Sequence, residues 1–241
     1  MTEGMALQGS VAFVTGRNRG LGRAFVETLL ARGASKVYAG ARNRQSVDIR
    51  GAVPIQVDVT DPESVARAAR DCGDVTLLVN NAGIARLTSD SLDPAAVDIS
   101  LETFEINYLG VVRASQAFAP VILANGGGGI VNVLSDQAWS SRPAAVAYAA
   151  SKSAAWSYTN ALRMDLGPRG VRVVGLHVGF IDTDMVSMLE VRKSDPAVVA
   201  GHALDGLEAG LEEVLADDQA RLVKESLSGN QAYYLAPADM T

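Results

Sequence analysis

The sequence predicts an α/β fold in which a doubly wound parallel sheet lies between two layers of helices. Short apolar segments alternate with longer helical ones, and several of the short segments are apolar on consecutive residues, as in strands covered on both faces. Such alternation favours right-handed crossovers within one sheet. The 241 residues contain no linker and no repeat, which predicts a single domain over residues 1–241. The expected strands are Val11–Val14, Lys36–Ala39, Val53–Val57, Val75–Val79, Gly129–Leu134 and Val171–Val178.

Helical periodicity supports the intervening segments. Leu21, Phe25 and Leu29 recur every four residues and so share one helix face. Thr60 and Glu63 have the spacing of a capping box that would begin the helix after the third strand. That helix carries an apolar stripe, in which Cys72 is interpreted as a small core residue. The stripe is formed by Val65, Ala68, Ala69 and Cys72.

Composition argues against several classes of protein. The net charge is −6 and no block of Lys and Arg is present, which disfavours nucleic-acid binding. No apolar run is long enough to predict a membrane span, and no His/Cys/Asp cluster has metal-ligand spacing. The single cysteine cannot form an internal disulfide, and residues 1–10 do not resemble a signal peptide. A cytoplasmic protein is therefore expected.

A glycine turn follows the first strand and precedes a helix. In this context backbone N–H groups and the positive end of the helix can hold a pyrophosphate, as in a Rossmann-type α/β/α fold. The spacing Gly-x-x-x-Gly-x-Gly differs from the common Gly-x-Gly-x-x-Gly, and an ordinary glycine turn is the alternative. The turn supplies the candidate cofactor-binding residues Gly16, Arg17, Asn18, Arg19, Gly20, Leu21 and Gly22.

The end of the second strand indicates which dinucleotide binds. An acidic residue there would accept hydrogen bonds from the ribose of NAD, but the sequence is Gly40-Ala41-Arg42. Arg42, together with Arg19, could pair with the 2′-phosphate of NADP(H). Two solvated surface arginines are the alternative. NADP(H) is thus the preferred cofactor, with NAD(H) possible.

Tyr148 and Lys152 form the candidate chemical centre. Four residues on a helix place their side chains on one face, about 5–6 Å apart at Cβ. A lysine ammonium at that distance would lower the tyrosine pKa by about two units from its usual value near 10, and so suit it to acid–base work near neutral pH. Ser135, at the end of the fifth strand, could hold a substrate oxygen against Tyr148. A surface helix pair is the alternative for an isolated Tyr-x-x-x-Lys.

Taken together, the ordered motifs resemble the short-chain dehydrogenase/reductase family, over about residues 11–185. The matching pieces are Thr15-Gly16-x-x-x-Gly20-x-Gly22, Asp58, Asn80-Asn81-Ala82-Gly83, Asn107, Ser135 and Tyr148-x-x-x-Lys152. The resemblance implies a carbonyl reductase-like enzyme with Tyr148 as acid/base and Ser135 as the residue that orients the carbonyl. It implies that Lys152 contacts the nicotinamide ribose and that Asn107 holds a water of a proton relay.

The resemblance also implies further cofactor contacts. Asp58 and Val59 would contact the adenine and Asn80 the adjoining ribose, with Ala82 and Gly83 beside them. After the sixth strand the family usually has Pro-Gly and then a Thr that binds the carboxamide. Here Val178 replaces the proline, while Gly179, Ile181 and Thr183 keep their places. His177 precedes this loop and is interpreted as structural.

A substrate lid is expected, by resemblance, at about residues 184–206. Its apolar residues favour a neutral, apolar ketone, aldehyde or secondary alcohol, and Trp139 could form another wall of the pocket. The alternative is that these side chains simply belong to the core. The apolar residues of the lid are Met185, Met188, Leu189, Val198 and Val199.

The last residues depart from the family, which often ends in a strand and a Gly-Gly pair used in subunit association. This chain has Gln231-Ala232-Tyr233-Tyr234-Leu235-Ala236-Pro237. A homodimer or homotetramer is expected, with its exact state left open by this difference. The leading functional hypothesis is an NADP(H)-dependent carbonyl reductase or alcohol dehydrogenase. A noncatalytic dinucleotide sensor is the alternative. An epimerase or dehydratase is less favoured, because the chain lacks length for their added substrate domain.

Overall fold

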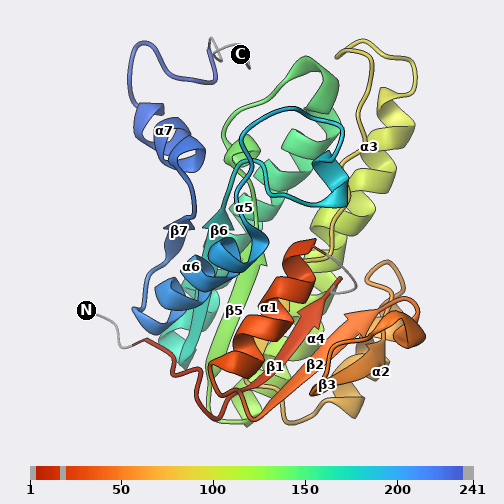
Figure 1. The fold of residues 1–241 in the computed structure, drawn as a ribbon, viewed down its shortest axis with the longest axis vertical. Helices are drawn as coiled ribbons and strands as arrows, with labels where there is room; N and C mark the ends of the chain where they lie inside the picture. Colours follow the sequence, from red (N-terminus) through yellow and green to blue (C-terminus); the bar gives the residue numbers. More distant parts are fainter. Residues whose placement is uncertain (1–3, 17–19, 236–241) are drawn as a thin grey trace.

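A computed structural model describes residues 4–16 and 20–235. Seven parallel strands form one sheet in the order β3-β2-β1-β4-β5-β6-β7 (Figure 1). The five central strands are almost wholly buried, because helices cover both faces, and this explains their continuous apolar sequences. The strands are β1 Val11–Thr15, β2 Lys36–Ala41, β3 Ala52–Gln56, β4 Leu77–Asn80, β5 Gly128–Val133, β6 Val171–His177 and β7 Glu213–Leu215.

The helices form the two outer layers. The α1 and α6 helices pack on one face with Phe25 and Leu204 in that core, whereas α2, α4 and α5 cover the other face around Phe13 and Phe118 (Figure 1). The Phe13 and Phe118 rings are 4.5 Å apart at their centroids. The three-layer α/β/α prediction is therefore confirmed. The helices are α1 Gly20–Ala31, α2 Pro62–Asp71, α3 Ala96–Phe104, α4 Gly110–Ala124, α5 Val146–Leu166, α6 Pro196–Glu208 and α7 Asp218–Ser226.

Two local expectations need correction at α2 and at the last strand. The α2 helix is capped by Asp61, whose carboxylate accepts from the Glu63 amide, so the Thr60–Glu63 capping box is wrong. Thr60 instead donates to Asp58, at 2.8 Å, within the preceding turn. The seventh strand, β7, was not predicted, because three residues are too few to show a periodic pattern. Cys72 is fully buried at the end of α2, as predicted.

One helical stretch is long and apolar enough to cross a membrane by length and composition. It runs from Ala96 to Ala124 through α3, a π-helical turn at Glu105–Leu109 and α4, although the sequence had suggested no such run. Within it, Phe118 and Ile122 are fully buried against the sheet. Its apolar character is thus explained by packing in the core, as expected for a central helix of a three-layer fold.

Candidate active site

A cavity of about 880 Å³ opens at the carboxyl ends of the strands. This edge includes the point between β1 and β4 where the strand order reverses, the usual ligand crevice of such sheets. The cavity is lined by sixteen of the predicted catalytic, cofactor-binding and substrate-binding residues. These are Gly16, Gly20, Leu21, Gly22, Arg42, Asp58, Val59, Ala82, Gly83, Ser135, Tyr148, Lys152, Gly179, Ile181, Thr183 and Met185.

The glycine turn approaches two neighbouring loops so closely that side chains would not fit. Gly16 has φ +67°, and a Cβ there would lie 2.6 Å from the Cα of Ala82. Gly20 has φ +54°, and its Cβ would lie 2.7 Å from the Thr183 side chain. Positive φ and close approach are both tolerated by glycine alone. The predicted cofactor contacts of Arg17, Asn18 and Arg19 lie outside the described residues.

A set of hydrogen bonds joins this turn to the loop after β4. The Thr15 hydroxyl accepts from the amides of Asn81 and Ala82, at 3.0 and 3.1 Å. The Asn81 side-chain amide donates to the Gly16 carbonyl at 2.9 Å. These hydrogen bonds hold the glycine turn and the loop after β4 in place on either side of the cavity. With the N-terminal end of α1 beside it, this part of the cavity fits the pyrophosphate of a dinucleotide.

Arg42, Asp58 and Val59 lie together where the adenosine of such a dinucleotide would be. Arg42 is exposed at the end of β2, and among the described residues it has no ion-pair partner. Asp58 is turned into its own loop, where its Oδ1 accepts from the amide and hydroxyl of Thr60. The guanidinium of Arg42 therefore remains available to an anion, whereas the Asp58 carboxylate is already engaged.

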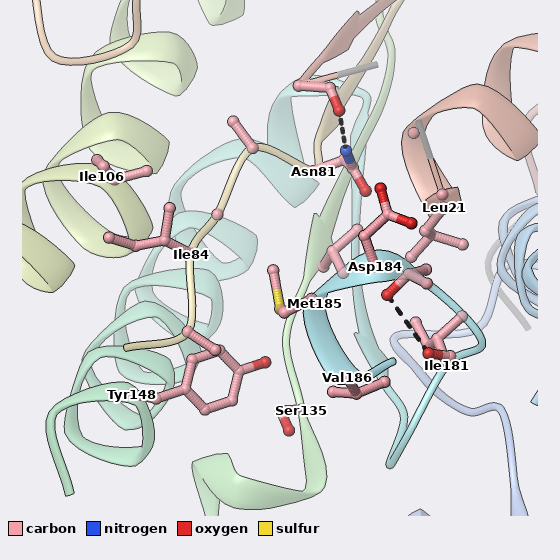
Figure 2. Close-up of a pocket in the computed structure, with 18 of the residues that line it drawn as sticks. Leu21, Asn81, Ile84, Ile106, Ser135, Tyr148, Ile181, Asp184, Met185 and Val186 are labelled. Atoms are coloured by element: carbon pink, nitrogen blue, oxygen red, sulfur yellow. Dashed lines mark hydrogen bonds between the residues drawn. The ribbon is translucent and has the colours of Figure 1, made fainter. Parts of the chain in front are cut away.

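Tyr148, Lys152 and Ser135 converge on the other part of the cavity. Tyr148 and Lys152 come from the first turns of α5, and the Lys152 Nζ lies 5.7 Å from the centre of the Tyr148 ring. The Tyr148 hydroxyl is directed toward the space between Ser135 and Met185 (Figure 2), and Ser135 is close enough to lower the Tyr148 pKa slightly. The Lys152 Nζ donates to the Val133 carbonyl, at 2.8 Å. The structure thus brings the three predicted catalytic side chains together.

The protonation of this centre differs from the expectation. Burial raises the pKa of Tyr148 to about 12, against a smaller lowering by the nearby Ser135 side chain. Burial also lowers the pKa of Lys152 to about 8. The lysine charge was expected to be the dominant influence on the pKa of the tyrosine, but in the structure the effect of burial is larger. Tyr148 is therefore held in its neutral, proton-donating form.

Asn107 is fully buried and does not line the cavity. It belongs to the π-helical turn between α3 and α4, an irregularity that is frequent at functional sites. Its side chain is bonded to the amide and carbonyl of Ile84, at 2.8 and 2.9 Å, and to Ser151. A Cβ on Gly83 would lie 3.2 Å from its Oδ1 and 3.8 Å from the Lys152 Nζ. Asn107 and Lys152 thus face the same small space, which Gly83 leaves open.

Besides Asn107, two predicted site residues do not line the cavity. Asn80 is buried and donates to Asn132 and Ser115, at 2.8 and 3.1 Å, so it ties β4 to β5 and α4. The Trp139 ring stacks on His177, with centroids 3.8 Å apart, instead of forming a wall of the pocket. Neither residue is among those that line the cavity. Asn81 and Ala82, which follow Asn80, line the cavity instead.

His177 is fully buried at the end of β6, in agreement with its interpretation as a structural residue. Its Nδ1 lies 3.1 Å from the Ser135 carbonyl and its Nε2 lies 3.7 Å from Glu213. Glu213 also accepts from Trp156 at 3.1 Å and from Lys224 at 2.7 Å. These contacts hold the pKa of Glu213 well below its usual range. The backbone that carries Ser135 is therefore connected, through the buried His177, to a half-buried charged cluster behind the site.

The predicted lid, residues 184–206, divides into two parts. Met185, Val186, Met188 and Leu189 line the cavity, and Met188 is largely exposed. Val199 is instead fully buried in the core, because α6 packs against α1, and Val198 faces outward. Only the first part of the segment has the position expected of a lid.

Several residues that line the cavity were not predicted from the sequence. Asn81 was quoted within a motif without a role, and Ile84, Ile106 and Phe180 carry no recognisable chemical pattern. Asp136 is the most notable of them, because it is a buried carboxyl next to Ser135. Its place directly after a candidate catalytic serine was a signal that could have been read from the sequence.

Comparisons with known proteins agree with this geometry. The sequence matches the short chain dehydrogenase family model over residues 10–193. This chain is a short-chain dehydrogenase/reductase. It is 34% identical, over 96% of its length and 100% of the other, to the 3-oxoacyl-[acyl-carrier-protein] reductase of Escherichia coli (strain K12).

Solved structures of other short-chain dehydrogenases share the fold. One from Burkholderia cenocepacia J2315, in complex with NADP, has a TM-score of 0.88 and 38% identity, covering 94% of this chain and 95% of that one. The 3-ketoacyl-(acyl-carrier-protein) reductase of Brucella melitensis, complexed with NADH, has a TM-score of 0.79 and 25% identity, covering 87% and 96%. The present short-chain dehydrogenase/reductase is an oxidoreductase that interconverts a carbonyl compound and its alcohol, and the noncatalytic sensor is not favoured.

Proposed function

We propose that this enzyme uses NADP(H) to reduce a ketone or aldehyde, or to oxidise the corresponding alcohol, with Tyr148 as the proton donor. The observation that carries the proposal is the convergence of Tyr148, Ser135 and Lys152 at one end of a cavity whose other end fits a dinucleotide. The hydride for the carbonyl carbon would come from the nicotinamide when the cofactor is bound. Tyr148 supplies the proton for the carbonyl oxygen, so a C=O bond becomes a CH–OH group.

The remaining residues would prepare and restore Tyr148. Its raised pKa keeps the proton on the hydroxyl until the carbonyl oxygen becomes more basic during reduction. Lys152, protonated below about pH 8, then stabilises the tyrosinate. Asn107 would hold a water beside Lys152, from which a proton can return through Lys152. Residues 184–189 would cover the substrate.

Replacement of Tyr148 tests the assignment of the proton donor. Tyr148→Phe removes only the hydroxyl, so the protein should fold and bind cofactor while kcat falls by about 10²- to 10⁴-fold. Turnover of NADPH with a panel of ketones, followed by absorbance, measures the loss. Tyr158→Phe, on the same helix but outside the cavity, is the matched control and should retain activity. Near-normal rates for Tyr148→Phe would refute the role.

The preference for NADP(H) is proposed from Arg42. Its exposed guanidinium lies at the adenosine part of the cavity, and the relative from Burkholderia cenocepacia was solved with NADP. Arg42→Asp should weaken NADPH binding much more than NADH binding, because the new carboxylate would repel the 2′-phosphate. Arg70→Asp, at the exposed end of α2, makes the same charge change elsewhere. Equal effects of Arg42→Asp on both cofactors would show that Arg42 does not read the phosphate.

A cytoplasmic homodimer or homotetramer is proposed for the assembled enzyme. Leu101 and Met164 are exposed on α3 and α5, at 67% and 78%, and large exposed apolar side chains are candidates for burial between subunits. Light scattering of the purified protein measures the assembly. A monomer at micromolar concentration would contradict this proposal without affecting the chemistry.

A further inference from the structure

Asp136 places a carboxyl group beside the reacting atoms. It directly follows Ser135, lines the cavity, and is 3% exposed. Its Oδ1 accepts the Ser135 hydroxyl proton at 2.9 Å, and its backbone amide donates to the Val178 carbonyl at 3.2 Å. The residue is thus held between the ends of β5 and β6, one hydrogen bond away from Ser135 Oγ.

The surroundings only partly stabilise this carboxylate. Burial raises the pKa of Asp136, while the Ser135 hydroxyl, the Arg142 charge and the Gln137 amide lower it by less, and the Asp217 charge adds to the rise. A buried carboxylate is stabilised by each hydrogen-bond donor that reaches it. A donor on the bound substrate would therefore be recognised strongly at this position.

We propose that Asp136 recognises a hydroxyl group on the carbon next to the carbonyl, so that the preferred substrates are α-hydroxy ketones and, in reverse, vicinal diols. This inference rests on the proposed function, because it takes the carbonyl to be bound between Tyr148 and Ser135. It goes beyond the proposed function by naming a polar group on an otherwise apolar substrate.

The hydrogen bonds at Ser135 explain why the recognised group lies so near the carbonyl. The hydroxyl of Ser135 has one proton, which is donated to Asp136, so Tyr148 is the group that donates to the carbonyl oxygen. A substrate oxygen held near Ser135 Oγ lies within about two hydrogen-bond lengths of the Asp136 carboxylate. A hydroxyl on the adjacent carbon spans that distance.

Most of the other side chains near Tyr148 in the cavity are apolar. Ile84, Met185 and Val186 lie around Tyr148 and Ser135, whereas the carboxylate of Asp184 lies nearer to Asn81 and Leu21 (Figure 2). Ile106 and Leu189 also line the cavity, and none of these five apolar side chains offers a donor or a strong acceptor. A ketone without the hydroxyl would give the buried carboxylate no donor from the substrate, so that only protein groups such as the Ser135 hydroxyl would stabilise it, and such a ketone should be the poorer substrate. Discrimination is thus expected to depend on Asp136 itself.

A pair of ketones of equal size isolates this effect. 2-Hydroxyacetophenone and propiophenone differ by a hydroxyl in place of a methyl group, and kcat/KM with NADPH is measured for both. Their intrinsic reactivities differ, but this difference cancels when their ratio is compared between the native enzyme and Asp136→Val. We expect the ratio to fall by about tenfold or more in the variant, the effect of one hydrogen bond to a charged group. Asp165→Asn, on the exposed face of α5, removes a distant carboxylate and should leave the ratio unchanged.

The outcomes separate the possible roles of Asp136. Loss of the preference, with propiophenone turnover kept within a few-fold, supports recognition of the hydroxyl. An equal fall for both ketones would overturn it and leave Asp136 as a residue that only positions Ser135. An unchanged ratio would also overturn it. If Asp136→Val does not fold, the nearly isosteric Asp136→Asn is used, and a partial loss of the preference is expected.

A binding measurement distinguishes failure of this inference from failure of the proposed function. Calorimetric titration of the two ketones into the NADPH complex of Tyr148→Phe requires no turnover. Tighter binding of 2-hydroxyacetophenone, lost in Tyr148→Phe/Asp136→Val, supports recognition even where no ketone is reduced. Equal affinities for both ketones would overturn the inference, whereas absence of turnover in the native enzyme would overturn only the proposed function.

Discussion

Lys152 is expected to lower the free energy of unfolding of the enzyme, although it is needed for catalysis. Its side chain is 5% exposed, and burial lowers its pKa from 10.5 to about 8. A shift of about 2.5 units corresponds to about 3 kcal/mol at 1.36 kcal/mol per unit, which is the cost of keeping the ammonium charged in the folded state at pH 7. Lys152→Met has a similar shape without the charge. This substitution should raise the free energy of unfolding by about 2–3 kcal/mol at pH 7. This value already subtracts the stabilisation that is lost with the hydrogen bond to Val133.

The pH dependence gives this prediction a definite sign. Between pH 8 and 10.5 the unfolded chain binds a proton at Lys152 that the folded protein has lost, so the stability of the native enzyme rises with pH in that window. At pH 9.5 about 2 kcal/mol of the cost should be recovered. The advantage of Lys152→Met should therefore shrink as pH rises from 7 to 9.5. Working below pH 10 avoids Tyr148, whose raised pKa lowers stability only above pH 10.

Urea unfolding at several pH values measures both quantities. Lys36→Met is the matched control, because Asp74 raises the pKa of Lys36 and gives it the opposite sign. That variant should show no stabilisation at pH 7. An Lys152→Met protein that is less stable than the native one at pH 7, or whose advantage does not change with pH, would refute the reasoning. Activity should be lost in Lys152→Met whatever the stability.

Three further predictions concern the framework of the site. Gly16→Ala should lower the free energy of unfolding by about 1–3 kcal/mol or more, because Gly16 has a positive φ and lies close to Ala82. Thermal unfolding measures this loss. His177→Phe should preserve stacking on Trp139 but remove the His177 contact with the Ser135 carbonyl, which then keeps only the Ala138 amide as donor. The expected cost is about 0.5–1.5 kcal/mol, with a fall in kcat and little change in NADPH affinity. A stability equal to the native one would contradict this view of His177. Cys72, whose pKa burial raises to about 12, should react with a thiol reagent only after unfolding, and rapid labelling of the native enzyme at pH 8 would exclude its burial.

The sequence predicted the sheet and most of the cavity because both follow from local patterns. Continuous apolar strands require cover on both faces, and parallel strands bring all their carboxyl ends to one edge. Gly16, Tyr148 and Ser135 each follow or face such an end, so order along the chain was enough to assemble them.

The order of motifs along the chain could not predict the direction in which each side chain points. Asn80 is the last residue of β4 and points toward Asn132, while the next residue, Asn81, reaches the glycine turn. Trp139 lies four residues after Ser135, but the short helical turn between them directs its ring onto His177. The burial of Tyr148 could not be predicted from the sequence either, and this burial raises the tyrosine pKa, whereas a lowering was expected. These features depend on tertiary packing.

The charged cluster behind Ser135, formed by His177, Glu213 and Lys224, also lies against the side chains that give the enzyme its tryptophan fluorescence. The chain has two tryptophans, and both contact that cluster, with Trp139 and Trp156 rings 6.0 Å apart and the Lys224 ammonium 4.5 Å from the centre of the Trp139 ring. All tryptophan emission therefore comes from one location next to the reacting atoms. A fluorescence titration or melting curve of this protein will record events at the floor of the active site, and distant parts of the sheet will need a different probe.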